Sequence, residues 1–203
     1  MSLELLDAIS CALLAAGASS RGAVLGARFS GAAALGLACG LSGPLGRELL
    51  LVGAEGARCV LGAFPACAFA GSLGGLCAVF LARSYSWRIF FWLDNAGIGL
   101  ATCLGACVAM PQIGAVGALV LGMVAGLLPG LLRDVALGDT AMLVEQDWYA
   151  SAAALGAILT LALSALPLFG IFPARIREWS IFSGFFLVLV LRWWKMSPKN
   201  MGH

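Results

Sequence analysis

Two arginine–acid pairs are the residues of this sequence whose types and spacing point to a functional role. Arg47-Glu48 follows the turn-forming segment 42–46, and Arg133-Asp134 follows the segment 128–132. Apolar residues continue past both pairs, so the charges lie inside apolar stretches. An arginine or aspartate at the centre of a bilayer costs about 2.5–3.5 kcal/mol on insertion scales. Four such side chains in matching positions therefore predict a bundle interior or a water-filled path.

Proline and glycine beside these pairs predict a local break in each helix. Pro44 and Pro129 each lack a backbone donor and clash with the preceding turn. Gly43 and Gly130 allow dihedral angles that other residues resist. We expect a kink or an unwound turn at each motif, with carbonyl oxygens freed to bind water or ions.

These residues could conduct a cation. The freed carbonyls and the hydroxyl of Ser42 would replace part of the hydration shell of the ion. Glu48 and Asp134 would supply a negative field, while Arg47 and Arg133 would hold the acids or narrow the path. The alternative is a buried ion pair that only stabilises the bundle. Adjacent side chains diverge by about 100° on a helix, so we expect each arginine to find its partner elsewhere than in its neighbour.

Three further acids are candidate pore-mouth charges. Asp7 and Asp94 lie near the start of two apolar segments, where charges that interact with the helix dipole are an equally good interpretation. Asp139 begins an acidic cluster that a solvated loop would also explain.

The composition sets the protein class. Of 203 residues, 62% are hydrophobic and 11% are charged, which predicts an integral membrane protein. A formal net charge of +2 without a basic stripe excludes a nucleic-acid binder. The seven cysteines form no CxxC pair, and the one histidine is terminal, so we expect buried thiols, no metal site and no cofactor.

Seven apolar segments are long enough to cross a membrane as helices. They lie near residues 3–20, 30–52, 60–82, 90–110, 114–137, 149–170 and 179–195. All six tryptophans fall at or just beyond a segment end, as in interfacial belts. Seven lysine and arginine residues lie on one predicted side of the membrane and three on the other, with the two embedded arginines omitted. This bias predicts the N-terminus outside and the C-terminus inside.

The chain also matches itself at offsets of 86 and 87 residues. Leu6-Asp7 recurs as Leu93-Asp94, and the same order is kept by the pairs Gly31-Ala32 and Gly117-Ala118, Leu35-Gly36 and Leu121-Gly122, Gly40-Leu41 and Gly126-Leu127, and Arg47-Glu48 and Arg133-Asp134. Each unit holds three segments, so the two must enter the membrane in opposite senses. We therefore predict an all-α membrane protein with a single domain over 1–203. It comprises repeat one (about 3–82), an inverted repeat two (about 90–170) and a seventh helix (about 179–195), with the functional site at the repeat interface.

The combined pattern resembles the trimeric intracellular cation (TRIC) channel family, in its bacterial and archaeal branch. The likeness runs from about residue 5 to 195 and is carried by the two Leu-Asp pairs and by segments 42–48, 128–138, 149–150 and 155–157. It implies a homotrimer in a prokaryotic cell membrane with a pore in each protomer, lined mainly by the first, second, fourth and fifth helices and gated at the second and fifth. The permeant ions would be monovalent, chiefly potassium, with modest discrimination against sodium. Two departures are the prolines that break the family's triple glycine and Glu48 in place of aspartate.

Two other function classes remain beside a passive cation channel. A secondary transporter for a small solute uses the same inverted architecture, but no acid lies at the centre of a segment to couple transport. An embedded enzyme or a rhodopsin-like receptor lacks support, because no catalytic dyad is visible and both lysines, Lys195 and Lys199, lie at the C-terminal edge. We therefore expect a channel and no enzyme activity.

Overall fold

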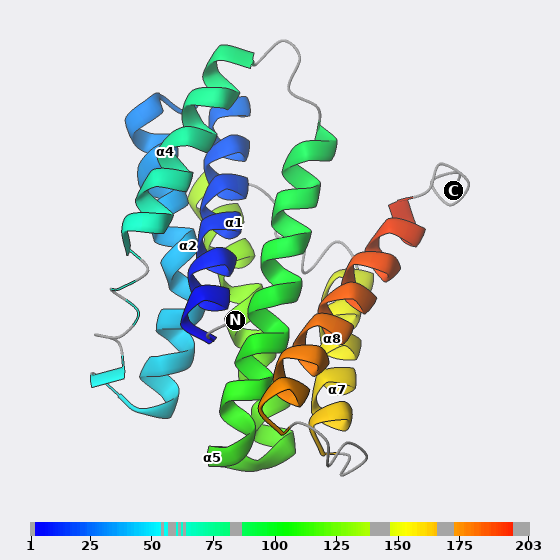
Figure 1. Ribbon diagram of the computed structural model, residues 1–203. Coiled ribbons are helices and arrows are strands. Elements are labelled where there is room, and N and C mark those ends of the chain that lie inside the picture. The colour runs from blue at the N-terminus through cyan, green and yellow to red at the C-terminus, as the bar shows by residue number, and fades with distance from the viewer. Residues whose placement is uncertain are drawn as a thin grey trace.

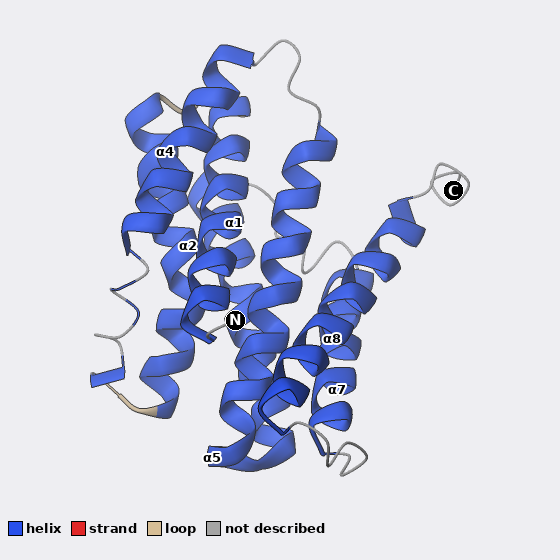
Figure 2. Ribbon diagram, in the orientation of Figure 1, coloured by secondary structure: helices blue, strands red, loops and turns tan. Residues whose placement is uncertain are grey.

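The computed structural model is helical throughout the part of the chain that it describes. That part comprises residues 3–53, 55–56, 60, 62, 64–81, 87–138, 147–165 and 173–196. Figure 2 shows helices and short loops only in this part. The helices are α1 (Leu3–Val24), α2 (Phe29–Leu51), α4 (Phe64–Leu81), α5 (Trp87–Leu137), α7 (Asp147–Ala165) and α8 (Pro173–Met196).

The long element α5 folds back on itself. Gly114 has φ 73° and ψ 174°, values that glycine adopts freely and that interrupt the helix. A Cβ built on Gly122 would lie 2.7 Å from the carbonyl oxygen of Thr102 and 2.8 Å from the Cβ of Ala106, so the two arms are in contact. The first arm (87–113) and the second arm (115–137) run in opposite directions in Figure 1. The described residues thus form the six helical elements given above, where the sequence predicted seven helices, and two of the predicted helices are the arms of α5.

Several of these helices have the length and composition of membrane spans. Within the described residues, α1, α2 and the segment Trp92–Leu137 are long and apolar enough to cross a membrane, while Phe64–Gly74 and Tyr149–Ala165 are shorter apolar helices. The chain is an integral membrane protein by these features, because so many apolar side chains remain outside its core: Val116 is 80% exposed and Phe69 is 71% exposed.

Small residues let α1 and α2 approach closely, and the two arms of α5 pack in the same way. A Cβ on Gly36 would lie 2.6 Å from the carbonyl oxygen of Ala15 and would overlap the hydroxyl of Ser19. The residues Ala15, Ser19 and Gly36 correspond to Thr102, Ala106 and Gly122, which follow them in the sequence by 87, 87 and 86 positions, respectively. Equivalent positions therefore make equivalent helix–helix contacts.

The helices α1 and α5 meet through a contact with the same symmetry. A Cβ on Gly97 would lie 2.7 Å from the side chain of Leu14, and one on Gly17 would lie 3.4 Å from the backbone of Asp94. As the residue number rises on α1 it falls on α5, so these segments are antiparallel. This contact places the start of α5 beside the middle of α1.

The C-terminal pair α7 and α8 covers the first arm of α5 (Figure 1). Gly184 of α8 packs on the carbonyl oxygen of Gly156 in α7, and the hydroxyls of Ser164 and Ser180 are 2.9 Å apart. The rings of Trp92 and Trp193 have centroids 5.1 Å apart and join α5 to α8. These contacts fix α8 against the start of α5.

The cysteine side chains that the structure describes are buried, and none of them forms a disulfide bond. They are Cys11, Cys39, Cys103 and Cys107, in agreement with the prediction of buried thiols. The side chains of Cys59, Cys67 and Cys77 lie outside those described.

Candidate functional site

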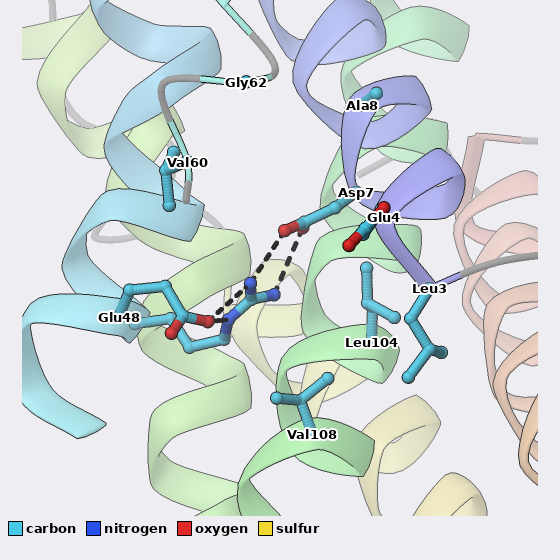
Figure 3. Close-up of a pocket in the computed structure, with 10 residues that line it drawn as sticks. Leu3, Glu4, Asp7, Ala8, Glu48, Val60, Gly62, Leu104 and Val108 are labelled. Atoms are coloured by element: carbon cyan, nitrogen blue, oxygen red, sulfur yellow. Dashed lines mark hydrogen bonds and ion pairs between the residues drawn. The ribbon is translucent and has the colours of Figure 1, made fainter. Parts of the chain in front are cut away.

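The first of two arginine–carboxylate clusters joins α1 to α2. We call Asp7, Arg47 and Glu48 the first cluster (Figure 3). The guanidinium of Arg47 donates to both carboxylate oxygens of Asp7, with Nη2–Oδ2 at 2.7 Å and Nη1–Oδ1 at 3.1 Å. Its Nε donates to Oε1 of Glu48 at 2.8 Å. This bidentate geometry is the strong form of an arginine–carboxylate contact.

The second cluster joins the two arms of α5 and consists of Asp94, Arg133 and Asp134. Nη1 of Arg133 donates to Oδ1 of Asp94, and its Nε donates to Oδ1 of Asp134 at 2.7 Å. The second oxygen of Asp94 accepts a hydrogen bond from the hydroxyl of Tyr149 in α7 at 3.0 Å. Asp94 is therefore shared between an arginine and a tyrosine, whereas both oxygens of Asp7 bind one arginine.

Helical hairpins bring these side chains together. Asp7 lies in the second turn of α1 and Arg47 lies near the end of α2, and an antiparallel pair places these two ends side by side. Asp94 and Arg133 lie near the two ends of α5, which its turn at Gly114 brings together. The arginine and its distant acid are 40 residues apart in one cluster and 39 in the other. Each arginine thus has an acid partner within its own half of the chain.

The expectation about arginine partners was half wrong. Each arginine does bind a distant acid, as predicted, but it also binds the acid next to it in sequence. The 100° divergence of neighbouring side chains does not prevent this contact, because the guanidinium presents five donors in several directions. Asp7 and Asp94, predicted as helix-start or pore-mouth charges, are the distant partners. Their recurrence with the arginines at nearly the same spacing was the signal that could have paired them.

The two clusters differ in their access to water. The side chains of Asp7 and Glu48 are 20% and 15% exposed, whereas those of Asp94 and Asp134 are 5% and 2% exposed. A cavity of about 550 Å³ opens onto the first cluster (Figure 3), and it is lined besides by Leu3, Glu4, Ala8, Val60, Gly62, Leu104 and Val108. We call it the Asp7 cavity. The clusters are therefore chemically alike, but one faces a cavity and the other is sealed.

The net charge of the first cluster favours cations. Asp7 and Glu48 carry two negative charges and Arg47 carries one positive charge, which leaves −1, and Glu4 in the cavity wall makes the sum −2. Such an excess in a low-dielectric recess raises the local concentration of cations.

The proline motifs form continuous helix. Helical structure runs through Pro44 and Pro129, and positive φ angles among the described residues occur only at Gly26, Gly53, Gly114 and Gly138. The expected unwound turn is therefore absent. A proline removes one hydrogen bond of the helix, while the remaining bonds and the packing of α2 on α5 keep the helical path.

The two motifs meet where α2 crosses the second arm of α5. A Cβ on Gly43 would lie 3.1 Å from Cγ of Pro129 and would overlap the carbonyl oxygen of Ala125. A Cβ on Gly46 would lie 3.0 Å from the side chain of Leu128. Gly43 and Pro129 are themselves 86 residues apart. The repeated motifs therefore pack directly against each other in the middle of the bundle.

Comparison with known proteins shows what this chain is similar to. A family model described as a glycine transporter matches residues 91–165, which include most of α5 and all of α7. A TRIC orthologue from Rhodobacter sphaeroides has 26% identity and a TM-score of 0.75, with 95% of this chain and 96% of that chain covered. The chain is thus similar to a TRIC channel over nearly its whole length.

Two further TRIC structures share the fold at 18% identity. One was solved to explain conductance through TRIC cation channels, and it has a TM-score of 0.77 over 98% of this chain and 95% of that one. The other is a prokaryotic TRIC channel in 0.5 M KCl, with a TM-score of 0.79 over 96% and 98%. The search of curated proteins gave no match. The resemblance predicted from the sequence is thereby confirmed over nearly the whole chain.

Most of the predicted site residues lie together in this chain. Gly43, Pro44, Pro129 and Gly130 are buried near the α2–α5 crossing. The hydroxyl of Ser42 is half-buried and donates to the carbonyl oxygen of Cys39 at 2.9 Å, one turn back in its own helix. Asp139 lies outside the described residues.

Sequence reasoning missed two residues beside the second cluster. Tyr149 donates to Asp94, and Arg192 of α8 donates to the carbonyl oxygen of Tyr149. Arg192 is one of the seven basic residues that set the predicted inner side. Its position within an apolar run, four residues before the end of α8, was the available signal that it is buried.

Proposed function

We propose that this protein is a passive cation channel, permeable to potassium and sodium, with a pore in each protomer of a homotrimer. The observation that carries the proposal is the pair of arginine–carboxylate clusters in repeat-related positions, one of which faces the Asp7 cavity. Similarity over 95% of the chain to a TRIC channel supports the same function.

The Asp7 cavity serves as the entrance for cations. Its carboxylates attract cations, and Arg47 is held by two acids at the inner wall, so that it limits the width of the path. The side chains of Leu104 and Val108 form the apolar side of the cavity. A hydrated monovalent ion would be held weakly here, as conduction requires.

The crossing of α2 and the second arm of α5 forms the gate. Ala125 lies four residues before Pro129, so its carbonyl oxygen lacks the usual helical donor. Gly43 packs on this oxygen and covers it. Movement of α2 away from the crossing would expose the oxygen to the path, where it would bind a partly dehydrated cation. The structure described is a closed state in this proposal.

Seven crossings follow if each arm of α5 spans the membrane. The chain then forms two inverted units of three crossings, followed by α8, with the N-terminus outside and the C-terminus inside. Apolar side chains that remain exposed in the single chain, such as Phe186 and Val116, would face lipid or the other protomers.

Cation flux through reconstituted protein tests the proposal. Unitary potassium currents in planar bilayers, and potassium flux into proteoliposomes without a coupling ion, are expected. Asp134→Asn should change the flux, because it removes one acid from Arg133. Arg28→Gln is the matched control, because Arg28 is exposed at the start of α2 and lies outside both clusters.

A solute transporter is the competing outcome. The family model described as a glycine transporter covers only part of the chain, whereas the similar channel structures cover 95% or more. Saturable glycine uptake driven by a sodium or proton gradient, with no unitary currents, would overturn the channel proposal. Flux that is the same in Asp134→Asn and in the wild type would exclude the second cluster from the gate.

A further inference from the structure

A buried arginine of α8, Arg192, connects this helix to the second cluster through Tyr149. Arg192 is 1% exposed. Its Nη1 donates to Oδ1 of Asn95, and its Nη2 donates to the carbonyl oxygen of Tyr149 at 3.0 Å. The guanidinium also lies 4.2 Å from the centre of the Tyr149 ring, a cation–π contact. One side chain of α8 thus holds both the backbone and the ring of Tyr149.

Tyr149 in turn contacts the second cluster and the second proline motif, which lies beside the proposed gate. Its hydroxyl donates to Asp94 at 3.0 Å. The same hydroxyl would lie 2.9 Å from a Cβ built on Gly130, so it packs on the backbone of the second proline motif. A continuous set of contacts therefore runs from α8 through α7 to both arms of α5.

Within the part of the chain that the structure describes, the first cluster has no such cover. At an offset of 87 residues, Ala8 corresponds to Asn95, and Ala8 lies in the wall of the Asp7 cavity. The helix α8 follows both repeats, so its arginine serves one cluster only. Asp94, Asp134, Arg133 and Arg192 carry two negative and two positive charges, which sum to zero. The second cluster together with Arg192 is neutral and closed, whereas the first cluster is negative and open to the cavity.

We propose that Arg192 and Tyr149 are positioning residues that form a latch, which holds the second cluster shut and thereby favours the closed state of the channel. The proposal rests on the channel function proposed above. Displacement of α8 would withdraw Arg192 and free Tyr149, and Asp94 would then accept water and cations as Asp7 does. The latch is incomplete as a set of hydrogen bonds, because Asn95 Nδ2 and Arg192 Nε have no acceptor among the described residues. A network with unpaired buried donors is held less tightly than a satisfied one.

Single-channel recording of the full chain tests the latch. Tyr149→Phe removes only the hydroxyl, and Arg192→Gln removes both the charge and the planar guanidinium group with its paired donors. A hydrogen bond to a charged group is worth about a tenfold to hundredfold change in an equilibrium. Each variant should therefore raise the ratio of open to closed time about tenfold or more. Arg192→Lys, which keeps the charge but not the planar fork, should recover part of the wild-type ratio. The control Arg28→Gln should behave as the wild type.

Increased opening separates a latch from a structural role. A variant that merely folds badly would lose current or leak unselectively, so retained exclusion of choline must accompany the gain. If the wild type conducts and the open-to-closed ratio of Tyr149→Phe and Arg192→Gln stays within twofold of it, or falls, the latch is refuted while the channel proposal stands.

Thiol labelling tests the latch without any current. Cys39 is 1% exposed and interacts electrostatically with Arg133, Asp94 and Asp134. A small water-soluble maleimide should modify Cys39 about tenfold faster in Tyr149→Phe than in the wild type, as read by peptide mass spectrometry. Cys11, buried between α1 and α2, is the internal control and should not change. If no protein conducts, the channel proposal fails, and an unchanged Cys39 rate would then refute the latch as well.

Discussion

Replacement of Asp94 by asparagine should destabilise the protein far more than the same replacement of Asp7. Both acids bind the arginine of their cluster, so sequence alone treats them as equivalent. In the structure, Asp94→Asn changes the sum of charges of Asp94, Asp134, Arg133 and Arg192 from 0 to +1 in a sealed site. Asp7→Asn changes the sum for Asp7, Glu48 and Arg47 from −1 to 0 beside a cavity.

The expected magnitudes follow from this difference in burial. Removal of one partner of a buried ion pair costs about 3–5 kcal/mol, because it leaves a buried charge uncompensated. At Asp7 the remaining pair of Arg47 and Glu48 is neutral, and the cavity gives water access to Arg47. The loss there should resemble that of a hydrogen bond to a charged group, about 1.5–3 kcal/mol. We expect the free energy of unfolding to fall at least 1 kcal/mol further in Asp94→Asn.

Reversible unfolding in mixed detergent micelles measures both values. Circular dichroism follows the loss of helix as the fraction of denaturing detergent rises, and Arg28→Gln is the control for a charge change at the surface. An equal or greater loss in Asp7→Asn would refute the reasoning, since it would show that the two clusters are equally desolvated. A loss below about 1 kcal/mol in Asp94→Asn would show that water reaches the second cluster.

Two substitutions at the helix crossing give further predictions. Gly43→Ala should lower the free energy of unfolding by about 1–3 kcal/mol, because its Cβ would overlap the carbonyl oxygen of Ala125. Gly31→Ala, in the same helix but with no neighbouring atom within 4 Å, should raise it by up to about 1 kcal/mol through helix propensity, and a loss of equal size in both would contradict the crossing. Pro129→Ala should return a donor to Ala125 and reduce potassium flux in proteoliposomes. A flux at or above that of the wild type would exclude the freed carbonyl from the path.

Local patterns in the sequence predicted the helical elements well, because long apolar blocks in a membrane can form only structures that satisfy their own backbone hydrogen bonds. The predicted break at 111–113 is a turn at Gly114 within one continuous element. The prolines are a different case. Pro44 and Pro129 predicted a kink or an unwound turn, and of these two the unwound turn is absent, because α2 and the second arm of α5 stay helical through both prolines.

The paired charges show where sequence reasoning reaches its limit. Recurrence at a fixed offset singled out Asp7, Arg47, Asp94 and Arg133, and the spacing of 40 and 39 residues contained their pairing. Nothing in the repeat distinguishes the two clusters from each other. The partner that makes the second cluster different, Arg192, is 97 residues from Asn95, and no local pattern connects them.

The sequence by itself determined that this chain is a helical membrane protein that resembles TRIC channels and has charges embedded at two related places. Those features follow from hydropathy, from the cost of buried charge and from the order of residues along the chain. Only the tertiary structure decided which acid binds which arginine, and that one cluster opens to a cavity while the other is sealed by α7 and α8. The reason is that exposure and charge balance depend on helices distant in sequence. Two identical motifs can therefore acquire different environments once a helix outside the repeat packs on one of them.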